Sequence, residues 1–440
     1  MSTTKTESVN VSLSKPTNVR WYVFFSILVL CSINYVDRAV ISVLMPAIQS
    51  DLGFSPVLIG FVFSAFFWGY TLMQLPAGWL CDRVSPGKII VGTGVLWGGF
   101  QILTGIVSSS KLFILIRVLL GISESPIYPA GGKLQSVWLT STERGRGAAL
   151  LDAGSAIGNA IGAPLCALFM VWLDGWRGAL FGTGVLTILV VLMCRKLVSG
   201  TPETSTLVNE AEREYLRKAF EEEDGIDAAN AKEQDGSALK GYLKDRSFWG
   251  VCLGFFAYDA FWYGLMTWGA LYLAATQHLD IKGLGGAIFI IYGVGVLGGL
   301  GGGALTDRWR RNAGADSNSV LHKLLPVLGI LIAIPMYLLS VVTDVYSAVA
   351  LLTIAMFFEK WAGCTYWSMP AIVSPRQHSG AVGGAMNFWG NLGGAIVPIV
   401  VGFIVGTTGS YFWALMLFVG LAIALGIIPL FIDFNKKIGA

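Results

Sequence analysis

Long apolar stretches separated by short polar segments run along most of the chain. About twelve of these stretches reach the 18 or more residues that an α-helix needs to cross a bilayer, with few or no charges inside. Strands of a membrane barrel instead alternate apolar and polar residues over short segments, so the pattern excludes a β-barrel. The predicted spans are residues 22–46, 57–80, 88–108, 111–134, 147–171, 178–196, 248–274, 284–306, 321–342, 346–370, 380–406 and 411–434. The sequence therefore predicts an all-α integral membrane protein with twelve transmembrane helices.

A polar and densely charged segment follows the sixth predicted span. Within it, NEAEREYLRKAFEEE (209–223) has the composition of a surface helix, and DGIDAANAKEQDGS (224–237) is typical of a flexible linker. The chain is thereby divided into two halves of six spans. We predict a tail at residues 1–20, a first six-helix bundle at 21–196, a linker at 197–247, a second bundle at 248–434 and a second tail at 435–440.

Composition and charge placement agree with a membrane protein and set its orientation. Apolar residues make up 54% of the chain and charged residues 13%, against roughly 25% charged residues in soluble proteins. Of the 30 Lys and Arg residues, 24 fall in the tails and in the loops on the same side, three in the opposite loops and three inside spans. Positive charge favours the cytoplasmic side, so we expect both termini, and the linker, in the cytoplasm. The polar first twenty residues read as a cytoplasmic tail rather than a signal peptide.

The six cysteines and three histidines do not form a metal site. The cysteines are scattered in or beside spans without C-x-x-C spacing, and the histidines lie near loops. No catalytic constellation is visible either. We therefore expect that the protein is not an enzyme and that it uses no metal, no cofactor and no nucleic-acid partner.

Seven charged residues inside the predicted spans are the strongest functional signal. A charge at the centre of a bilayer costs at least about 2.5–3.5 kcal/mol, so each needs a partner, a cavity or a function. The seven lie in the interiors of spans 1, 4, 7 and 10, which is every third span from the first: Asp37, Arg38, Arg117, Glu124, Asp259, Glu359 and Lys360. Asp152 in the fifth span is only six residues from Arg146, so we expect it near the cytoplasmic interface. We expect these four helices to face a shared polar centre.

The spacing of these charges suggests how they pair. Arg117 and Glu124 are seven residues apart, so they share a helix face but lie about 10.5 Å from each other, too far for a direct contact. Asp37 and Arg38 point roughly 100° apart and are poor partners for each other. The simplest pairing joins Asp37 to Arg117 and leaves Arg38 free for an anion. The alternatives are a static buried ion network and, for Glu359 and Lys360, a local pair or side chains that extend to the interface.

The two halves of the chain carry the same short motif. GWLCDR (78–83) and GALTDR (303–308) both read G-x-L-x-D-R, offset by 225 residues, and Asp37 and Asp259 are offset by a similar 222. Parallel duplicated halves of six helices are an architecture of transporters. We expect each motif to form a short loop in which the glycine allows close packing and the aspartate caps a helix. The motif residues are Gly78, Asp82 and Arg83 in the first half and Gly303, Asp307 and Arg308 in the second.

These motifs resemble those of a known family. The G-x-L-x-D-R segments are similar to the signature of the major facilitator superfamily. NYVDRAVISVLMPAI, FFWGYTLMQLPAGWLCDR and RVLLGISESPIYPAGG resemble its anion:cation symporter branch, which includes bacterial sugar-acid and aromatic-acid permeases. The resemblance implies two pseudo-symmetric six-helix bundles around a central cavity, alternating access, and import of a small organic anion driven by the proton gradient. It also implies a monomer in the bacterial inner membrane.

The charges and the resemblance together give a hypothesis for the site. Arg38 holds the anionic group of the substrate, Asp37 and Glu124 carry the proton, and Arg117 couples them by changing partners. Arg117 and Asp259 are also candidates for substrate binding. The remaining candidates are polar or aromatic residues of several spans: Tyr70, Gln74, Ser155, Trp262, Tyr263, Tyr366, Trp367, Asn387 and Asn391. Asp259 and Ser155 depart from the pattern of sugar-acid members. Asp259 could meet a cationic or hydroxyl-rich part of the substrate, or add a proton site.

Two glycine-rich stretches and two rival functions complete the interpretation. GVGVLG (293–298) fits a dinucleotide-binding pattern but lies inside a span, and GSAIGNAIGAP (154–164) is a small-residue stripe; both indicate helix packing. The second stretch also resembles an element of drug antiporters. The alternatives to import are therefore efflux or antiport and, from another class, a sensor that retains the fold without transport.

Overall fold

The computed structural model describes residues 15–140, 143–230, 241–314, 319–374, 379–434 and 436–438. Within these ranges the secondary structure consists of helices. The first half comprises α1 (Val19–Leu52), α2 (Pro56–Arg83), α3 (Pro86–Ile106), α4 (Ser110–Glu124), α5 (Ile127–Trp138), α6 (Arg144–Trp172) and α7 (Trp176–Val198). After α8 (Glu210–Asn230), the second half comprises α10 (Arg246–Gln277), α11 (Ile281–Ala313), α12 (Ser319–Leu339), α13 (Val345–Val373), α14 (Ser379–Thr408), α15 (Phe412–Ile427) and the 3-10 turn η4 (Ile428–Phe431).

Every predicted span coincides with a helix or a pair of helices. Eleven membrane-crossing candidates in the described part of the chain are long and apolar enough, with α4 and α5 counted as one. The remaining span is α10, which is 32 residues long and packs among the others against α1, α14 and α15. Its Trp and Tyr residues carry polar atoms, which lower its hydropathy. The predicted all-α fold of twelve transmembrane helices is confirmed.

Short capping sequences set where the helices begin and end. The Asp280 carboxylate accepts a hydrogen bond from the Gly283 amide at the start of α11, and Asp344 does the same for Ser347 at the start of α13, both at 2.8 Å. Gly53 ends α1 in the left-handed conformation at φ 66°, which glycine adopts without strain. These caps lie at the ends of the apolar stretches, so the loops between helices are short.

The fourth span is broken in the middle, which the sequence interpretation missed. It was predicted as one helix over 111–134, but α4 ends at Glu124 and α5 begins at Ile127, with Ser125 and Pro126 between them. Proline has no amide hydrogen to donate and its ring clashes with the preceding turn, so a helix is interrupted there. The break directly follows one of the charged residues of the span.

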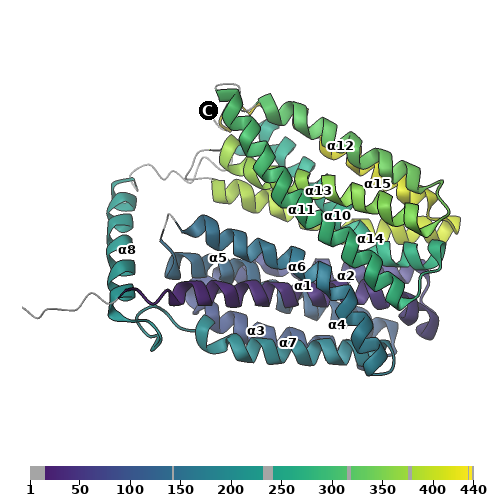
Figure 1. Ribbon diagram of the computed structural model, residues 1–440, viewed down its shortest axis with the longest axis horizontal. Helices are drawn as coiled ribbons and strands as arrows, with labels where there is room; N and C mark the ends of the chain where they lie inside the picture. The colour runs from purple at the N-terminus through teal and green to yellow at the C-terminus, as the bar shows by residue number, and fades with distance from the viewer. Residues whose placement is uncertain are drawn as a thin grey trace, which may run out of the picture.

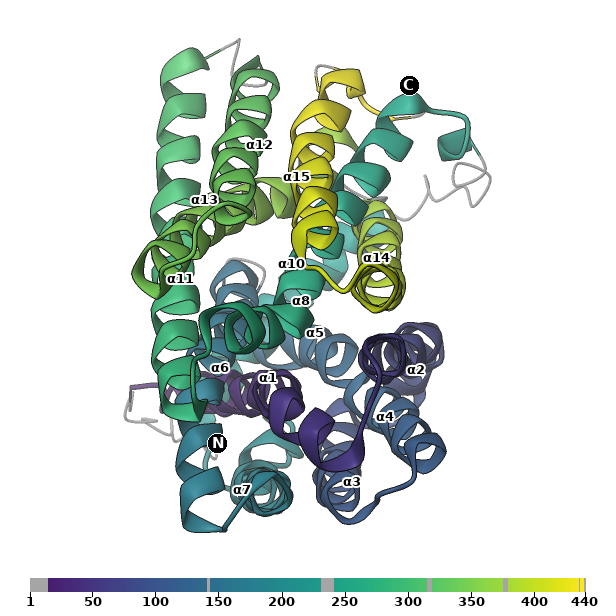
Figure 2. The same ribbon diagram turned by 90° about the vertical axis from the view of Figure 1, so that its right-hand side faces the viewer.

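The helices form two groups with an interface between them (Figures 1 and 2). In the first half α1 packs along α6, α3 along α7 and α2 along α4; in the second half α10 packs along α14, α11 along α13 and α12 along α15. Three helix pairs make most of the contacts between the halves: α2 with α14, α6 with α11, and α1 with α10. The pairing is equivalent in the two halves, as their duplicated sequence pattern predicts.

Glycines bring paired helices close together inside each half. A side chain added at Gly154 or Gly158 of α6 would collide with the backbone of α1 near Ser32. A side chain at Gly298 of α11 would likewise collide with the backbone of α13 at Phe357. Both glycine-rich stretches therefore serve helix packing, as predicted.

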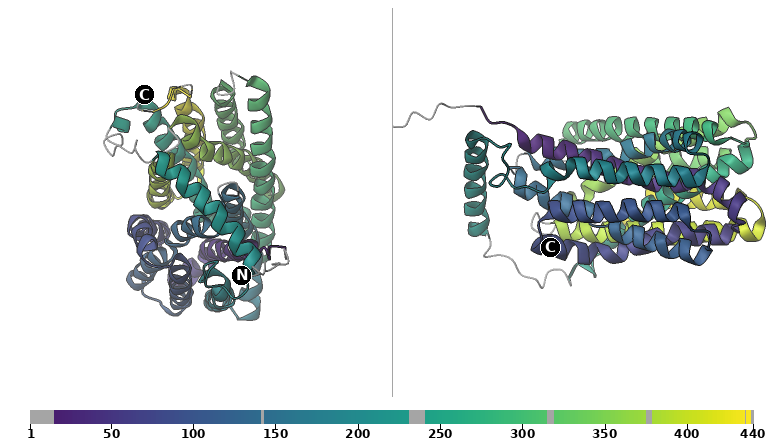
Figure 3. Two further views of the ribbon diagram at one scale, coloured as in Figure 1. Left: turned by 90° about the vertical axis from the view of Figure 1, so that its left-hand side faces the viewer. Right: turned by 90° about the horizontal axis from the view of Figure 1, so that it is seen from below.

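The charged helix α8 lies across one end of the bundle (Figures 1 and 3). We call this end the α8 side and the opposite end the far side. The predicted surface helix is confirmed, but it runs on to Asn230. The expected flexible linker therefore begins later than residue 224, and its continuation beyond residue 230 lies outside the described residues.

A buried ion cluster holds α8 to the first half. The Glu212 carboxylate of α8 accepts hydrogen bonds from the Thr17 hydroxyl at 2.6 Å, the Val19 amide at 2.9 Å and the Arg20 guanidinium at 2.8 Å. Arg20 also forms a salt bridge with Glu143, just before α6, at 3.0 Å. Glu212 thus caps the first turn of α1 from another helix. Burial raises the pKa of Glu212, but the hydrogen bonds from Thr17, Val19 and Arg20 lower it by a larger amount. The pKa of Glu212 therefore lies below its ordinary value.

The two G-x-L-x-D-R motifs do not form the loops that were expected. They are the last turns of α2 and the last third of α11, inside the helices. Gly78 has open space where a side chain would be, Arg83 stacks over Trp79 at 3.9 Å, and Asp307 is exposed. The side chain of Asp82 lies outside the described residues. In this conformation Gly78 makes no close helix contact, and Asp307 projects outward instead of capping a helix.

Candidate functional site

A cavity of about 560 Å³ lies between the two halves, within the end of the bundle nearer α8. Its walls come from α1, α2, α5 and α6 in the first half and from α10, α13 and α14 in the second. The lining residues are Tyr35, Tyr70, Tyr128, Ala148, Leu151, Ser155, Tyr258, Asp259, Trp262, Tyr263, Lys360, Cys364, Trp367, Asn387 and Asn391. This volume is within the range of sites for small polar molecules.

The cavity gathers most of the candidate residues but leaves some outside its walls. Those that line it are Tyr70, Ser155, Asp259, Trp262, Tyr263, Trp367, Asn387 and Asn391. Arg38, Gln74 and Arg117 do not line it. Tyr366 was expected at the wall but points away, and its hydroxyl donates to the Leu425 carbonyl of α15 at 2.5 Å. Adjacent residues of a helix point about 100° apart, so Trp367 can line the cavity while Tyr366 contacts α15.

A buried ion pair joins α1 to α4 just behind the cavity wall. The Arg38 Nε lies 2.9 Å from the Glu124 Oε2, and the two side chains are 2% and 0% exposed. The expectation that Arg38 would be unpaired and that Asp37 would pair with Arg117 is therefore wrong. Glu124 is the last residue of α4, directly before Ser125 and Pro126.

Three aromatic rings surround the Arg38 guanidinium. Its central carbon lies 4.7 Å from the Tyr35 ring centroid, 4.9 Å from that of Phe66 and 4.5 Å from that of Tyr70. Such rings stabilise a cation through their π faces. Both terminal nitrogens, Nη1 and Nη2, are buried without a hydrogen-bond partner among the described residues. Tyr35 and Tyr70 also line the cavity, so the rings of these two residues lie between the cavity and the unsatisfied nitrogens of Arg38.

Asp37 and Arg117 occupy separate environments. The Asp37 Oδ2 accepts a hydrogen bond from the Thr187 hydroxyl of α7 at 2.7 Å, while its Oδ1 has no partner in the described part of the chain. Arg117 stacks over Phe66 at 5.1 Å, and its Nε and Nη1 have no described hydrogen-bond partner. The charged centre of the first half therefore contains two carboxylates and two guanidiniums with one direct ion pair among them.

The second half contributes an ammonium group to the cavity. The Lys360 Nζ lies 2.9 Å from the Trp262 ring centroid, 3.1 Å from the Tyr258 hydroxyl and 3.4 Å from the Glu359 carboxylate. The local pairing that was one of the two alternatives for Glu359 and Lys360 is thus present. Lys360 nevertheless lines the cavity, whereas Glu359 is fully buried.

The halves are in tight contact on the far side. The Ser42 hydroxyl of α1 donates to the Thr267 carbonyl of α10 at 2.9 Å. The Ser64 hydroxyl of α2 also donates to the Ala395 carbonyl of α14. Contacts of this kind between α1, α2, α10 and α14 separate the cavity from the far side.

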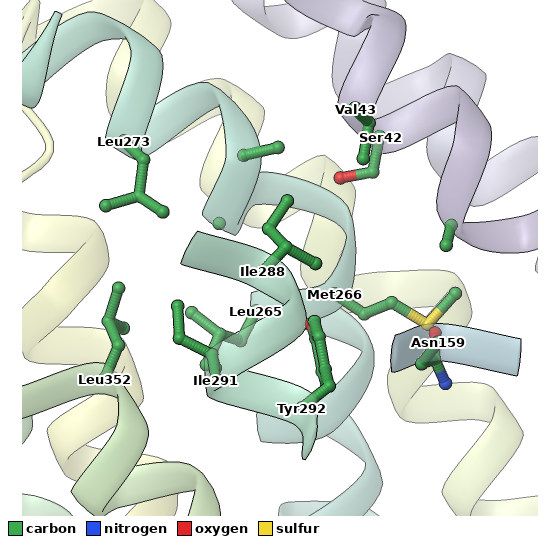
Figure 4. A pocket seen from close by; sticks show the side chains of 13 residues that line it. Ser42, Val43, Asn159, Leu265, Met266, Leu273, Ile288, Ile291, Tyr292 and Leu352 are labelled. Atoms are coloured by element: carbon green, nitrogen blue, oxygen red, sulfur yellow. The ribbon is translucent and has the colours of Figure 1, made fainter. Parts of the chain in front are cut away.

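A small void of about 20 Å³ lies beyond the cavity toward the far side. Figure 4 shows the side chains that line this void. Ser42 and Asn159 lie at its edge, and Leu265, Ile288 and Leu352 supply apolar walls. Ser42 lies about two turns beyond Tyr35 on α1, and Asn159 lies about one turn beyond Ser155 on α6. The void therefore lies in line with the cavity, within the closed end.

Several cavity residues were not identified from the sequence. Tyr35, Tyr128 and Tyr258 are aromatic residues in apolar spans, a pattern shared with packing residues. Cys364 carries no distinguishing spacing. Lys360 was recognised as a charge in a span but was not assigned to the site. The sequence did contain a signal for Tyr35 and Tyr258. Tyr35 lies two residues before Asp37, and Tyr258 lies directly before Asp259, which is at the equivalent position of the second half.

Comparisons with known proteins give one consistent result. The family model of the Major Facilitator Superfamily matches residues 27–398. The chain is 32% identical to the probable galactarate/D-glucarate transporter GudP of Bacillus subtilis (strain 168), over 92% of this chain and 90% of that protein. It is 31% identical to the probable L-galactonate transporter of Escherichia coli (strain K12), over 88% and 83% respectively.

Among solved structures, the fold is similar to that of a bacterial homolog of the human lysosomal transporter Spinster, described as inward-facing and unoccupied. The TM-score is 0.70 at 20% identity, over 94% of this chain and 95% of that one. At this identity the similarity concerns the fold alone. The predicted resemblance to the superfamily and to its sugar-acid transporters is confirmed by the sequence matches.

Proposed function

This chain belongs to the Major Facilitator Superfamily, a family of membrane transporters, and we propose that it is a proton-coupled importer of a small organic anion. The relatives named as galactarate/D-glucarate and L-galactonate transporters favour a hydroxylated sugar acid as the substrate. We place it in the bacterial inner membrane, as a monomer, with both termini and α8 in the cytoplasm. The α8 side is then the cytoplasmic side, and the cavity is accessible from within the cell.

One observation carries the proposal: the buried pair of Arg38 with Glu124, in which the guanidinium fork is left unsatisfied. Glu124 uses only the Nε edge of Arg38, so Nη1 and Nη2 have no described partner. A guanidinium fork matches a carboxylate with two parallel hydrogen bonds. A substrate carboxylate that passes between Tyr35 and Tyr70 would supply the missing acceptors.

The same pair supplies a means of coupling to protons. An ionised Glu124 competes with the substrate for Arg38. When Glu124 takes a proton it loses its charge, and the guanidinium becomes available to the anion. Release of the substrate on the other side of the membrane returns Arg38 to Glu124, which then gives up the proton. Proton and anion therefore bind together and leave together, as symport requires.

The rest of the charged centre supports this exchange. Asp37 is fixed by Thr187 on α7 and lies on the same helix as Arg38, so it provides a second carboxylate that can accept a proton. Arg117 adds positive charge to the centre on α4, the helix that ends at Glu124. The contacts on the far side would open and the halves would close on the α8 side during each transport cycle.

Counterflow in proteoliposomes tests the proposal. Purified protein would be reconstituted in vesicles preloaded with an unlabelled sugar acid, and uptake of the labelled acid would be followed with and without a pH gradient. We expect counterflow without a gradient and net accumulation when the outside is acidic. Absence of counterflow with any organic anion would refute the anion assignment. Accumulation with the opposite gradient would indicate antiport instead.

A further inference from the structure

Asp259 of α10 is a carboxylate in the cavity wall for which the coupling mechanism has no use. Asp259 is 5% exposed and lines the cavity. Its carboxylate accepts no hydrogen bond from the residues that the structure describes. Its position is fixed by α14, because a side chain at Gly390 would collide with the Asp259 Oδ2. Only glycine at that position lets the carboxylate lie so close to the α14 backbone.

A second acceptor lies on the same wall. The Asn391 amide nitrogen donates to the Asn387 backbone carbonyl at 2.9 Å and to the Asn387 Oδ1 at 3.2 Å. The Asn391 Oδ1 is buried without a partner among the described residues. Asp259 and Asn391, which we call the acceptor patch, thus present oxygen atoms without donors on the side of the cavity formed by the second half.

The neighbouring ammonium does not satisfy this patch. Lys360 is engaged by the Tyr258 hydroxyl, the Glu359 carboxylate and the Trp262 ring. Together Asp259, Glu359 and Lys360 comprise two carboxylates and one ammonium, so their formal charge is negative. A buried carboxylate without a donor is unfavourable, and the ligand is the group that can provide the missing hydrogen.

We propose that the acceptor patch makes the site selective for monocarboxylates whose other end carries hydrogen-bond donors, either hydroxyl groups or an ammonium. This inference rests on the proposed function, in which Arg38 holds the carboxylate. The two walls are then complementary to the two ends of one molecule: donors on the first half, acceptors on the second. A substrate with carboxylates at both ends would place its second carboxylate against Asp259 and be rejected by charge repulsion.

The test compares three six-carbon acids that differ at one end. Galactonate carries a terminal hydroxyl, 6-amino-6-deoxygalactonate a terminal ammonium, and galactarate a second carboxylate. Competition against labelled galactonate at neutral pH would be measured for the wild type and for Asp259→Asn, which keeps the shape of the side chain and removes its charge. Asp280→Asn is the matched control, because asparagine also caps a helix and Asp280 lies outside the cavity.

We expect the wild type to prefer galactonate over galactarate by about 10- to 100-fold, the range that the loss of a charge-assisted hydrogen bond produces. Asp259→Asn should reduce this ratio by at least tenfold and abolish any advantage of the amino compound. Asp280→Asn should leave the ratios unchanged. Equal competition by galactonate and galactarate in the wild type, or an unchanged ratio in Asp259→Asn, would overturn the inference while leaving the proposed function intact.

A second variant covers the case in which Asp259→Asn does not fold. Asn391→Asp adds a carboxylate to the acceptor patch and should increase the discrimination against galactarate. Ligand-induced thermal stabilisation in detergent gives the same ratios without transport. A decrease in discrimination in Asn391→Asp would contradict the inference. Failure of the wild type to bind any of the three acids would instead refute the proposed function.

Discussion

Replacing Glu124 by glutamine separates proton coupling from substrate exchange. The change removes the charge that pairs with Arg38 at 2.9 Å and preserves the size of the side chain. Breaking one partner of a buried ion pair costs about 3–5 kcal/mol, because the other charge is left uncompensated. In the variant, a substrate anion restores that compensation. We therefore expect Glu124→Gln to be less stable when empty and to gain more from the anion than the wild type does.

The expected accumulation follows from the number of protons that the pair can carry. One proton on Glu124 per monoanion makes the transported complex electroneutral, so the membrane potential should have no effect. A gradient of one pH unit corresponds to about 1.36 kcal/mol, a tenfold ratio. Wild-type vesicles should accumulate a monoanion about tenfold at one unit of pH difference. Glu124→Gln should equilibrate the substrate without accumulation, yet retain counterflow.

The assay is uptake of labelled galactonate into proteoliposomes, with the internal pH and potential clamped. Asp51→Asn is the control, because it neutralises a carboxylate that pairs with Arg177 near the far-side surface. It should accumulate the substrate as the wild type does. Tenfold accumulation by Glu124→Gln would refute the assignment of the coupling proton. Loss of counterflow in a variant that still shows anion-induced thermal stabilisation would also contradict it.

Four further outcomes are expected. Arg38→Lys retains the charge but loses the fork, so KM in counterflow should rise about 10- to 100-fold; an unchanged KM would contradict the role of Arg38. Gly158→Leu should lower the thermal unfolding temperature, because its side chain would collide with α1 at Ser32; unchanged stability would be inconsistent with the tight α1–α6 contact. Docking of α8 should persist above pH 4.5, the ordinary pKa of Glu212, and be lost only as the pH falls through its lowered pKa. Hydrogen exchange of the α8 amides would show this, and Glu212→Gln should be undocked at every pH. Finally, a thiol reagent should label Cys364, an exposed cavity residue, from the α8 side, and addition of substrate should slow the labelling.

The sequence predicted the membrane fold because the bilayer imposes simple requirements. A span needs a long apolar stretch, and a buried charge needs a purpose, so the twelve helices and the charged residues could be recognised without coordinates. The interruption of the fourth span was foreseeable from Pro126 but was overlooked, because apolar residues continue on both sides. That break places Glu124 at a helix end.

The pairing of the charges could not be predicted in the same way. Asp37, Arg38, Arg117 and Glu124 allow more than one set of ion pairs, and the choice depends on how α1 and α4 are rotated and shifted relative to each other. The structure pairs Arg38 with Glu124 and gives Asp37 a hydrogen bond from the hydroxyl of Thr187, in a span without charges in its interior. A single threonine in an apolar helix carries no signal of such a role.

The residues that line the cavity likewise include some that could be predicted from the sequence and some that could not. Asp259, Asn387 and Asn391 were recognised because polar residues in spans are rare, and all three line the cavity. Tyr35, Tyr128 and Tyr258 also line it, but tyrosines in membrane helices are common at interfaces and in packing. Their positions relative to Arg38 and Lys360 depend on tertiary structure.

Proton uptake on substrate binding would show whether the substrate replaces Glu124 on Arg38. Galactonate would be added to unbuffered wild-type protein in detergent at a pH where Glu124 is ionised, and the pH change would be followed with an indicator dye. We expect the wild type to take up one proton per anion bound, because the carboxylate of the substrate replaces that of Glu124 on Arg38. We expect Glu124→Gln to take up none. Binding to the wild type without proton uptake, or equal uptake by Glu124→Gln, would contradict this replacement.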